Sequence, residues 1–207
     1  FFFFLLAVVR GATIYCAIVS YASSCDAYHE TSPDPRGNGA VQVMYKALDN
    51  AGITPNDIDY INVHGTGTEA NDRIETMSMK KVFPNIYHIP LSSTKSYVGH
   101  NIGAAGIVEI IACFICLAED NLPPTLNFTQ PRHSCDLNYV PNFFQDKKVK
   151  FFMKNNYAFG GNNCSIIASP YITDKTPTEY KAKKVVITGV GAITSIGNNI
   201  MEIITAI

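Results

Sequence analysis

An apolar segment that contains a single charged residue places the strongest constraint on how this chain can fold. Residues 101–118 begin with Asn and otherwise contain only Gly, Ala, Val, Ile, Leu, Phe and Cys, apart from Glu109. Such a segment predicts a helix that is apolar on every side, and a helix of this kind is buried. A carboxylate inside it is costly unless it is protonated or paired with a cation. Lys95 is the only Lys or Arg between Lys81 and Arg132, so we predict a buried Lys95–Glu109 ion pair, with a Glu109 side chain that reaches the surface as the alternative.

Strand-like and helix-like segments alternate through most of the chain. Runs rich in β-branched and aromatic residues predict strands over residues 13–21, 59–63, 86–91, 151–157 and 164–168. Apolar residues at helical spacing predict one helix that ends at Gly52 and another over residues 69–83. Residues 92–100 are expected to form a loop. This alternation predicts an α/β fold built in layers.

The charge balance and the length of the apolar runs exclude several classes of protein. The chain has 16 Lys and Arg against 17 Asp and Glu, so no basic face is required and no nucleic-acid partner is expected. Its hydrophobic content of 47% excludes intrinsic disorder. Residues 1–9 are all apolar, but a bilayer span needs roughly 20 residues, so no membrane span is expected.

The six cysteines are scattered through apolar and loop segments of a chain that is long enough to form a core without disulfides. This favours reduced thiols and a cytoplasmic protein over a disulfide framework. Cys113 and Cys116 form a CxxC pair, but the pair lies in the apolar helix and has no second pair to complete a metal site. We therefore interpret both as core residues.

Two histidines are candidate functional residues because small residues follow each of them. His64 precedes Gly65, and His100 precedes Gly103 by three positions, which leaves room for a substrate to approach an imidazole. Together with a buried Lys95 they suggest an oxyanion or proton-transfer site. Either histidine alone would more simply be a core residue. A zinc site is not favoured, because there is no HExxH motif and no close Cys/His spacing.

Two glycine-rich segments need separate interpretations. Gly160 and Gly161 lie between asparagines after a predicted strand, where they allow positive φ and expose backbone N–H groups, although a hairpin turn has the same pattern. Gly189 and Gly191 begin a pattern like that of a dinucleotide-binding loop. Thr194 stands where the third glycine should be, and no acidic residue follows at the required distance, so we reject that interpretation.

Taken together, these motifs resemble the β-ketoacyl-acyl-carrier-protein synthases, the condensing enzymes of the thiolase-like superfamily. The resemblance covers residues 10 to 170 and rests on His64-Gly65-Thr66-Gly67-Thr68, on residues 93–106, on residues 156–163, and on residues 26–33 and 122–127. It implies a thiolase-like layered α/β fold, in which helices cover a mixed sheet.

The resemblance also implies a division of the chain. Residues 1–172 are similar to the C-terminal half of a ketosynthase, and residues 173–183 are polar and linker-like. Residues 184–207 resemble the start of a second ketosynthase-like unit.

The chemistry implied by the resemblance is a decarboxylative Claisen condensation between malonyl-acyl-carrier protein and an acyl thioester, in fatty-acid or polyketide-type synthesis. His64 and His100 match the two imidazoles that donate N–H groups to the enolate oxygen. Lys95 would keep both imidazoles neutral, and Glu109 would hold Lys95 in place.

A further catalytic role is implied for Phe159, and substrate binding is implied for Thr66, Thr68, Gly160 and Gly161. Phe159 matches one arm of an oxyanion hole and the gate over the acyl pocket, and Gly160 and Gly161 follow it in the same motif. Thr66 and Thr68 match positions that contact the phosphopantetheine arm, which arrives on the carrier protein, so neither a resident cofactor nor a metal is expected. The implied partners are acyl carrier protein, an N-terminal ketosynthase half, and a second subunit in a homodimer or ketosynthase heterodimer.

One departure from the family pattern keeps other functions open. The family's nucleophilic cysteine lies in an Ala/Ser/Thr/Gly-rich motif of the N-terminal half, and none of the six cysteines here has that setting. We expect the nucleophile to lie outside this chain. A non-catalytic ketosynthase-like partner subunit, of the chain-length-factor type, and an inactive fragment remain alternatives.

Overall fold

The structure is a computed structural model, and it describes residues 9–11 and 16–170. The predicted linker over residues 173–183 and the predicted second unit over residues 184–207 lie outside the described residues, as do residues 1–8 of the apolar start.

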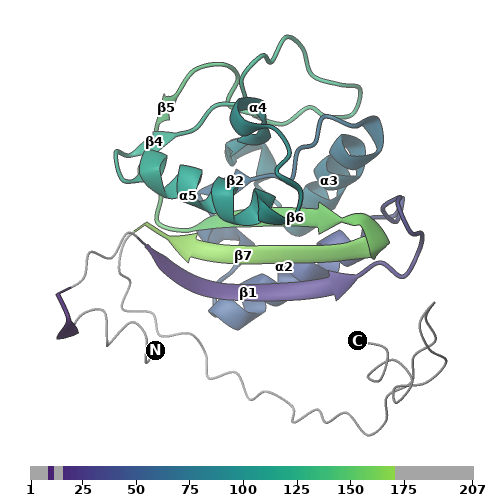
Figure 1. The fold of residues 1–207 in the computed structure, drawn as a ribbon, viewed down its shortest axis with the longest axis horizontal. Coiled ribbons are helices and arrows are strands. Elements are labelled where there is room, and N and C mark those ends of the chain that lie inside the picture. Colours follow the sequence, from purple (N-terminus) through teal and green to yellow (C-terminus); the bar gives the residue numbers. More distant parts are fainter. Residues whose placement is uncertain (1–8, 12–15, 171–207) are drawn as a thin grey trace, which may run out of the picture.

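A five-stranded mixed sheet forms the centre of the fold, as the resemblance predicted (Figure 1). The strand order is β1-β7-β6-β2-β3, in which β1, β7 and β6 pair antiparallel and β6, β2 and β3 pair parallel. The strands are β1 (Ala17–Cys25), β2 (Tyr60–Asn62), β3 (Leu91–Ser92), β6 (Phe152–Ala158) and β7 (Asn162–Ser169). A separate two-stranded sheet joins β4 (Asn121–Leu122) to β5 (Gln145–Asp146).

Helices α2 (Asn38–Ala51) and α3 (Glu69–Val82) cover one face of the sheet. In Figure 1, α2 lies behind β1 and β7. Gly52 ends α2 in the left-handed conformation, as its position in the sequence predicted. The core on this side includes side chains from both helices and the sheet, among them Met44, Leu48, Met79, Phe83, Ile61 and Met153.

Helix α5 (Ala105–Leu117) covers the other face, where Cys113 and Leu117 pack with Tyr60 and Phe152. A 3-10 turn (Ile102–Ala104) precedes it. The prediction of a helix buried on every side is wrong for the described residues, because the sheet covers only one side of α5. On the opposite side, Ile107, Ile111 and Ile115 are 62%, 51% and 67% exposed to solvent.

Three other sequence predictions differ from the structure. Residues 86–91 form a 3-10 turn (Ile86–His88) followed by β3, and not one strand. Pro90 has no N–H to donate to a sheet ladder, so the strand begins only after it. The predicted loop over residues 92–100 contains a one-turn helix, α4 (Lys95–Val98), which positions Lys95. The strand predicted over residues 13–21 is displaced to Ala17–Cys25, and residues 12–15 are not described.

A third 3-10 turn (Pro55–Asp57) connects α2 to β2, and a fourth (Phe159–Gly161) connects β6 to β7. Gly160 and Gly161 have φ of 80° and 73°, so the tight connection between the two strands depends on glycine. Among the described residues, no helix has both the length and the apolar character needed to cross a membrane.

Candidate active site

His64 lies at the end of β2, on a loop that buried hydrogen bonds hold in place. Its backbone N–H donates to Glu75 Oε1 at 2.8 Å, and the N–H of Gly65 donates to Glu75 Oε2 at 2.9 Å. Gly65 has φ of 45°, and a Cβ there would lie 2.6 Å from Ser93 Cβ. The glycine after His64 is therefore required both by its backbone conformation and by close packing. Sequence reasoning missed Glu75, although a carboxylate among the buried residues of α3 was a possible signal.

The predicted buried ion pair is confirmed. Lys95 Nζ lies 2.6 Å from Glu109 Oε1, and the two side chains are 6% and 1% exposed. The same ammonium group donates to the backbone carbonyl oxygen of His64 at 2.5 Å and lies 3.4 Å from His64 Nδ1. Lys95 thus connects the carboxylate of α5 to the histidine at the end of β2.

A second buried lysine, which sequence reasoning missed, shares Glu109. Lys154 Nζ lies 2.7 Å from Glu109 Oε2, and Asn156 donates to the same oxygen at 3.2 Å. Both residues belong to β6, where alternate side chains point to the face covered by α5. The signal in the sequence was a lysine within the apolar strand segment, since a buried cation needs a partner as much as a buried carboxylate does.

His64 and His100 lie beside each other with their rings nearly perpendicular, 5.6 Å apart between centroids. The backbone N–H of Ile102 donates to His100 Nδ1 at 3.1 Å. Because an ammonium group can only donate, Lys95 likewise makes His64 Nδ1 an acceptor. In the neutral form of each ring the proton is then on Nε2, where it can act as a donor.

The electrostatics of the cluster keep His64 neutral. Burial, followed by the charges of Lys95, Lys154 and His100, lowers the pKa of His64 from 6.5 to about 2. Burial alone would raise the pKa of Glu109, but the charge and hydrogen bonds of Lys154 and Lys95 outweigh burial and lower it. Burial lowers the pKa of Lys154, and Glu109 opposes this effect.

The predicted substrate-binding residues lie near this cluster, on two loops. Phe159 follows β6 and is 75% exposed, at the start of the turn that contains Gly160 and Gly161. Two residues earlier in the chain, the ring of Tyr157 lies 5.7 Å from the ring of His64. Thr66 and Thr68 lie on the loop after His64, and their hydroxyl groups are 3.0 Å apart.

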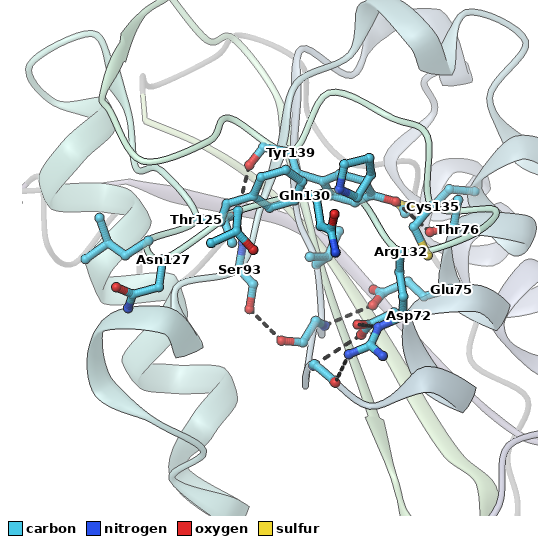
Figure 2. A pocket seen from close by; sticks show the side chains of 18 residues that line it. Asp72, Glu75, Thr76, Ser93, Thr125, Asn127, Gln130, Arg132, Cys135 and Tyr139 are labelled. Carbon is cyan, nitrogen blue, oxygen red and sulfur yellow. Dashed lines mark hydrogen bonds and ion pairs between the residues drawn. The ribbon is translucent and has the colours of Figure 1, made fainter.

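A cavity of about 460 Å³ lies on another side of the His64 loop, between α3 and the segment from Thr125 to Tyr139 (Figure 2). Arg132 closes one side of it, with Nη2 donating to the carbonyl oxygen of Gly67 at 2.7 Å and Nε lying 3.5 Å from Asp72. Ser93 in its wall donates to the carbonyl oxygen of Gly65 at 2.7 Å. Its lining includes neither His64 nor His100, so the cavity is separate from the histidine pair.

The cysteines and the other metal-binding side chains do not form a second site in the described part of the chain. There, no group of three or more His, Cys, Asp or Glu residues could hold a metal ion. All six cysteines are free, and Cys113 is buried in the core as the sequence indicated. Burial raises the pKa of Cys16 to about 11 and that of Cys113 to about 12, so neither thiol ionises at neutral pH.

Comparison with known proteins identifies the family to which this fold and site belong. The family described as "Beta-ketoacyl synthase, C-terminal domain" matches residues 15–129. The chain therefore belongs to the β-ketoacyl synthase family, within which it carries the C-terminal domain.

Individual relatives agree with this assignment. The 3-oxoacyl-[acyl-carrier-protein] synthase 2 of Synechocystis is 43% identical over 166 residues, which are 80% of this chain and 40% of that protein. The structure of the ishigamide ketosynthase/chain length factor matches with a TM-score of 0.76 and 36% identity, over 81% of this chain and 41% of that one. A further match is a type II PKS ketosynthase, bound to the hexaketide, in complex with its acyl-carrier protein. Its TM-score is 0.76 and its identity 34%, over 79% of this chain and 40% of that one. The fold is thus the thiolase-like α/β fold of ketosynthases, and the chain spans about 40% of the length of these relatives.

Proposed function

We propose that this chain is the C-terminal part of a β-ketoacyl-acyl-carrier-protein synthase, an acyltransferase of fatty-acid or polyketide-type synthesis. The observation that carries the proposal is the arrangement around Lys95. Its ammonium group is bound to buried Glu109 and makes Nδ1 of His64 an acceptor. His64 and His100 then have the neutral Nε2–H groups that stabilise a developing oxyanion.

The reaction divides into two half-reactions. A cysteine thiolate outside this chain attacks an acyl thioester and releases the thiol of the carrier protein. Malonyl-acyl-carrier protein then loses CO₂, and the electron pair of the broken C–C bond forms an enolate. The enolate carbon attacks the acyl-enzyme carbonyl, and the cysteine thiolate leaves as the β-ketoacyl product forms. His64 and His100 donate to the thioester oxygen while it carries the enolate charge.

The surrounding residues take supporting roles in this proposal. Phe159 supplies a backbone N–H to the oxyanion of the acyl-transfer step, and its exposed ring covers the acyl chain. Gly160 and Gly161 leave space for that chain. Thr66 and Thr68 hydrogen-bond the phosphopantetheine arm, which the carrier protein brings, so the chain needs no metal or resident cofactor.

The proposed partners follow from the same chemistry. They are acyl carrier protein, an N-terminal ketosynthase half, and a second ketosynthase-like subunit in a homodimer or heterodimer. Two similar structures support this, since one is a ketosynthase with its acyl-carrier protein and the other is a ketosynthase with a chain length factor. We place the reaction in the cytoplasm, where free thiols such as the six cysteines here persist.

The test is an assay of both half-reactions with this chain assembled with an N-terminal ketosynthase half that carries the cysteine. His64→Ala and His100→Ala are each expected to slow CO₂ release from malonyl-acyl-carrier protein by about 10²–10³-fold. Cysteine acylation should stay largely intact in both variants. His88→Ala, which changes an exposed histidine, is the matched control and should leave both rates unchanged.

Three results would contradict the proposal. Undiminished CO₂ release in both histidine variants would remove their role as enolate donors. Formation of β-ketoacyl product by residues 1–207 alone would show that the nucleophile lies in this chain. An assembly with no CO₂ release would favour a non-catalytic partner subunit of the chain-length-factor type.

A further inference from the structure

The charges at the centre of the site do not balance. Glu109 contributes one negative charge, whereas Lys95 and Lys154 contribute two positive charges at 2.6 and 2.7 Å from its two oxygens. Lys95 alone would neutralise the carboxylate. Because a buried cation costs free energy, a second lysine with a fully buried side chain needs a reason beyond pairing.

The position of Lys154 indicates that reason. Besides Glu109, its ammonium group donates to the carbonyl oxygens of Asn155, at 2.7 Å, and Val63, at 3.2 Å. Val63 is the residue immediately before His64. Lys95 donates to the carbonyl oxygen of His64 itself. Two ammonium groups are thus anchored to consecutive residues at the end of β2, with a single carboxylate between them.

We propose that Lys154 is a positioning residue, which holds Glu109 toward Lys95 and leaves one excess positive charge beside His64, so that this imidazole stays neutral. The inference deepens the proposed function and rests on it, because a neutral His64 matters for an N–H donor to the enolate. Protonation would place a third positive charge in the same buried cluster, which like-charge repulsion opposes.

Three other titratable groups lie around His64. His100, beside the imidazole ring, also lowers the pKa of His64. Tyr157 faces the ring from β6, and burial raises its pKa so that it stays neutral. Glu75 faces the backbone N–H of His64 from α3, and burial raises the pKa of its carboxyl despite the hydrogen bonds that it accepts.

The test compares the titration of the His64 ring in the full chain and in two variants. Lys154→Gln removes the charge but keeps donors for Val63 and Asn155, and Lys154→Met removes both charge and donors. Histidine ring carbons are labelled with ¹³C, and the His64 signal is assigned from its loss in His64→Gln. Lys80→Met removes a partly exposed lysine that pairs with Asp136, and it serves as the matched control.

In both Lys154 variants, the His64 signal should begin to titrate at a pH about one unit higher than in the parent chain. Lys80→Met should titrate like the parent. An unchanged onset in Lys154→Gln would overturn the proposal, and so would the absence of any titration down to the pH at which that variant unfolds. If only Lys154→Met changed the onset, the hydrogen bonds and not the charge would be responsible, which also overturns it.

This measurement separates the inference from the proposed function, because it needs no activity. If the onset shifts but the assembled protein releases no CO₂, the role of Lys154 stands and the proposed enzymatic function is rejected. In an active assembly, Lys154→Gln should also move the acid limb of the pH profile for CO₂ release to higher pH.

Discussion

Glu109 is the residue on which the ion pairs of the site depend, since both of its oxygens bind buried ammonium groups. Glu109→Ala leaves Lys95 and Lys154 beside each other without a counter-charge. Breaking a buried pair costs roughly 3–5 kcal/mol, so the free energy of unfolding should fall by about that amount. Urea denaturation of the full chain measures it, with Glu119→Ala, an exposed change just beyond the same helix, as the control.

The second lysine changes what would restore this stability. A double change of Lys95→Met and Glu109→Leu still leaves Lys154 without its carboxylate, so recovery should be incomplete. Adding Lys154→Met should recover most of the loss, because a well-packed apolar cluster can replace buried ion pairs. If Glu109→Ala unfolds at the same urea concentration as the parent, the buried ion pairs do not contribute as the structure indicates.

The depressed pKa of His64 predicts a dependence of stability on pH. The unfolded chain binds a proton at this residue below pH 6.5, whereas the folded chain binds it only near pH 2. Stability contributed by neutral His64 is therefore present above pH 6.5 and falls as the pH decreases, by about 1.4 kcal/mol per pH unit. Glu109 adds a further loss only below its unfolded pKa of 4.5.

Denaturation of the parent chain and of His64→Gln at pH 7, 6 and 5 isolates the contribution of His64, because every other titratable group is common to the two proteins. His64→Gln should unfold with a smaller change across the range than the parent chain does. An identical pH dependence in the two proteins would mean that His64 titrates normally in the folded state.

At the scale of elements, the loop between β2 and α3 positions His64 through two glycines with different constraints. A Cβ at Gly65 would overlap Ser93, whereas a Cβ at Gly67 would meet open space, and both residues have positive φ. Gly67→Ala should therefore cost only the strain of a left-handed alanine, about 1–2 kcal/mol. Gly65→Ala should cost clearly more and should also displace His64.

Thermal denaturation of both glycine variants measures the difference, and the His64 ring signals report the displacement. Equal melting temperatures would show that the loop moves away from Ser93 without cost, and that close packing does not fix the position of His64.

At the scale of the whole molecule, the uncovered side of α5 is an apolar surface. Ile107, Ile111 and Ile115 are four residues apart and form one exposed stripe. Contiguous apolar patches on soluble proteins mark interfaces or aggregation sites. We predict that the full chain self-associates. The double change Ile111→Lys and Ile115→Lys should reduce self-association, as measured by size-exclusion chromatography.

Co-expression with an N-terminal ketosynthase half should also reduce self-association of the parent chain, because the stripe would be covered. The control is Tyr87→Lys, which changes an exposed residue that hydrogen-bonds Asp136, and it should not change the elution volume. A parent chain that elutes as a monomer at all concentrations would show that the stripe needs no partner.

The sequence by itself determined those features that depend on local chemistry. A carboxylate in the apolar segment around Glu109 required a cation, and Lys95 was identified as that cation. The alternation of strands and helices indicated an α/β fold, and the motifs around His64, Lys95 and Phe159 indicated the ketosynthase family. These inferences held because desolvation, helix periodicity and motif spacing can all be evaluated from neighbouring residues.

The tertiary structure alone decided which distant residues complete the site. Lys154 reaches Glu109 because β6 pairs parallel with β2 and turns alternate side chains toward α5, and strand order cannot be derived from spacing along the chain. Glu75 anchors the His64 loop because α3 returns beside the end of β2. Only the tertiary structure decided which side of α5 is exposed, since hydrophobicity indicates that a surface must be covered but not which part of the protein covers it.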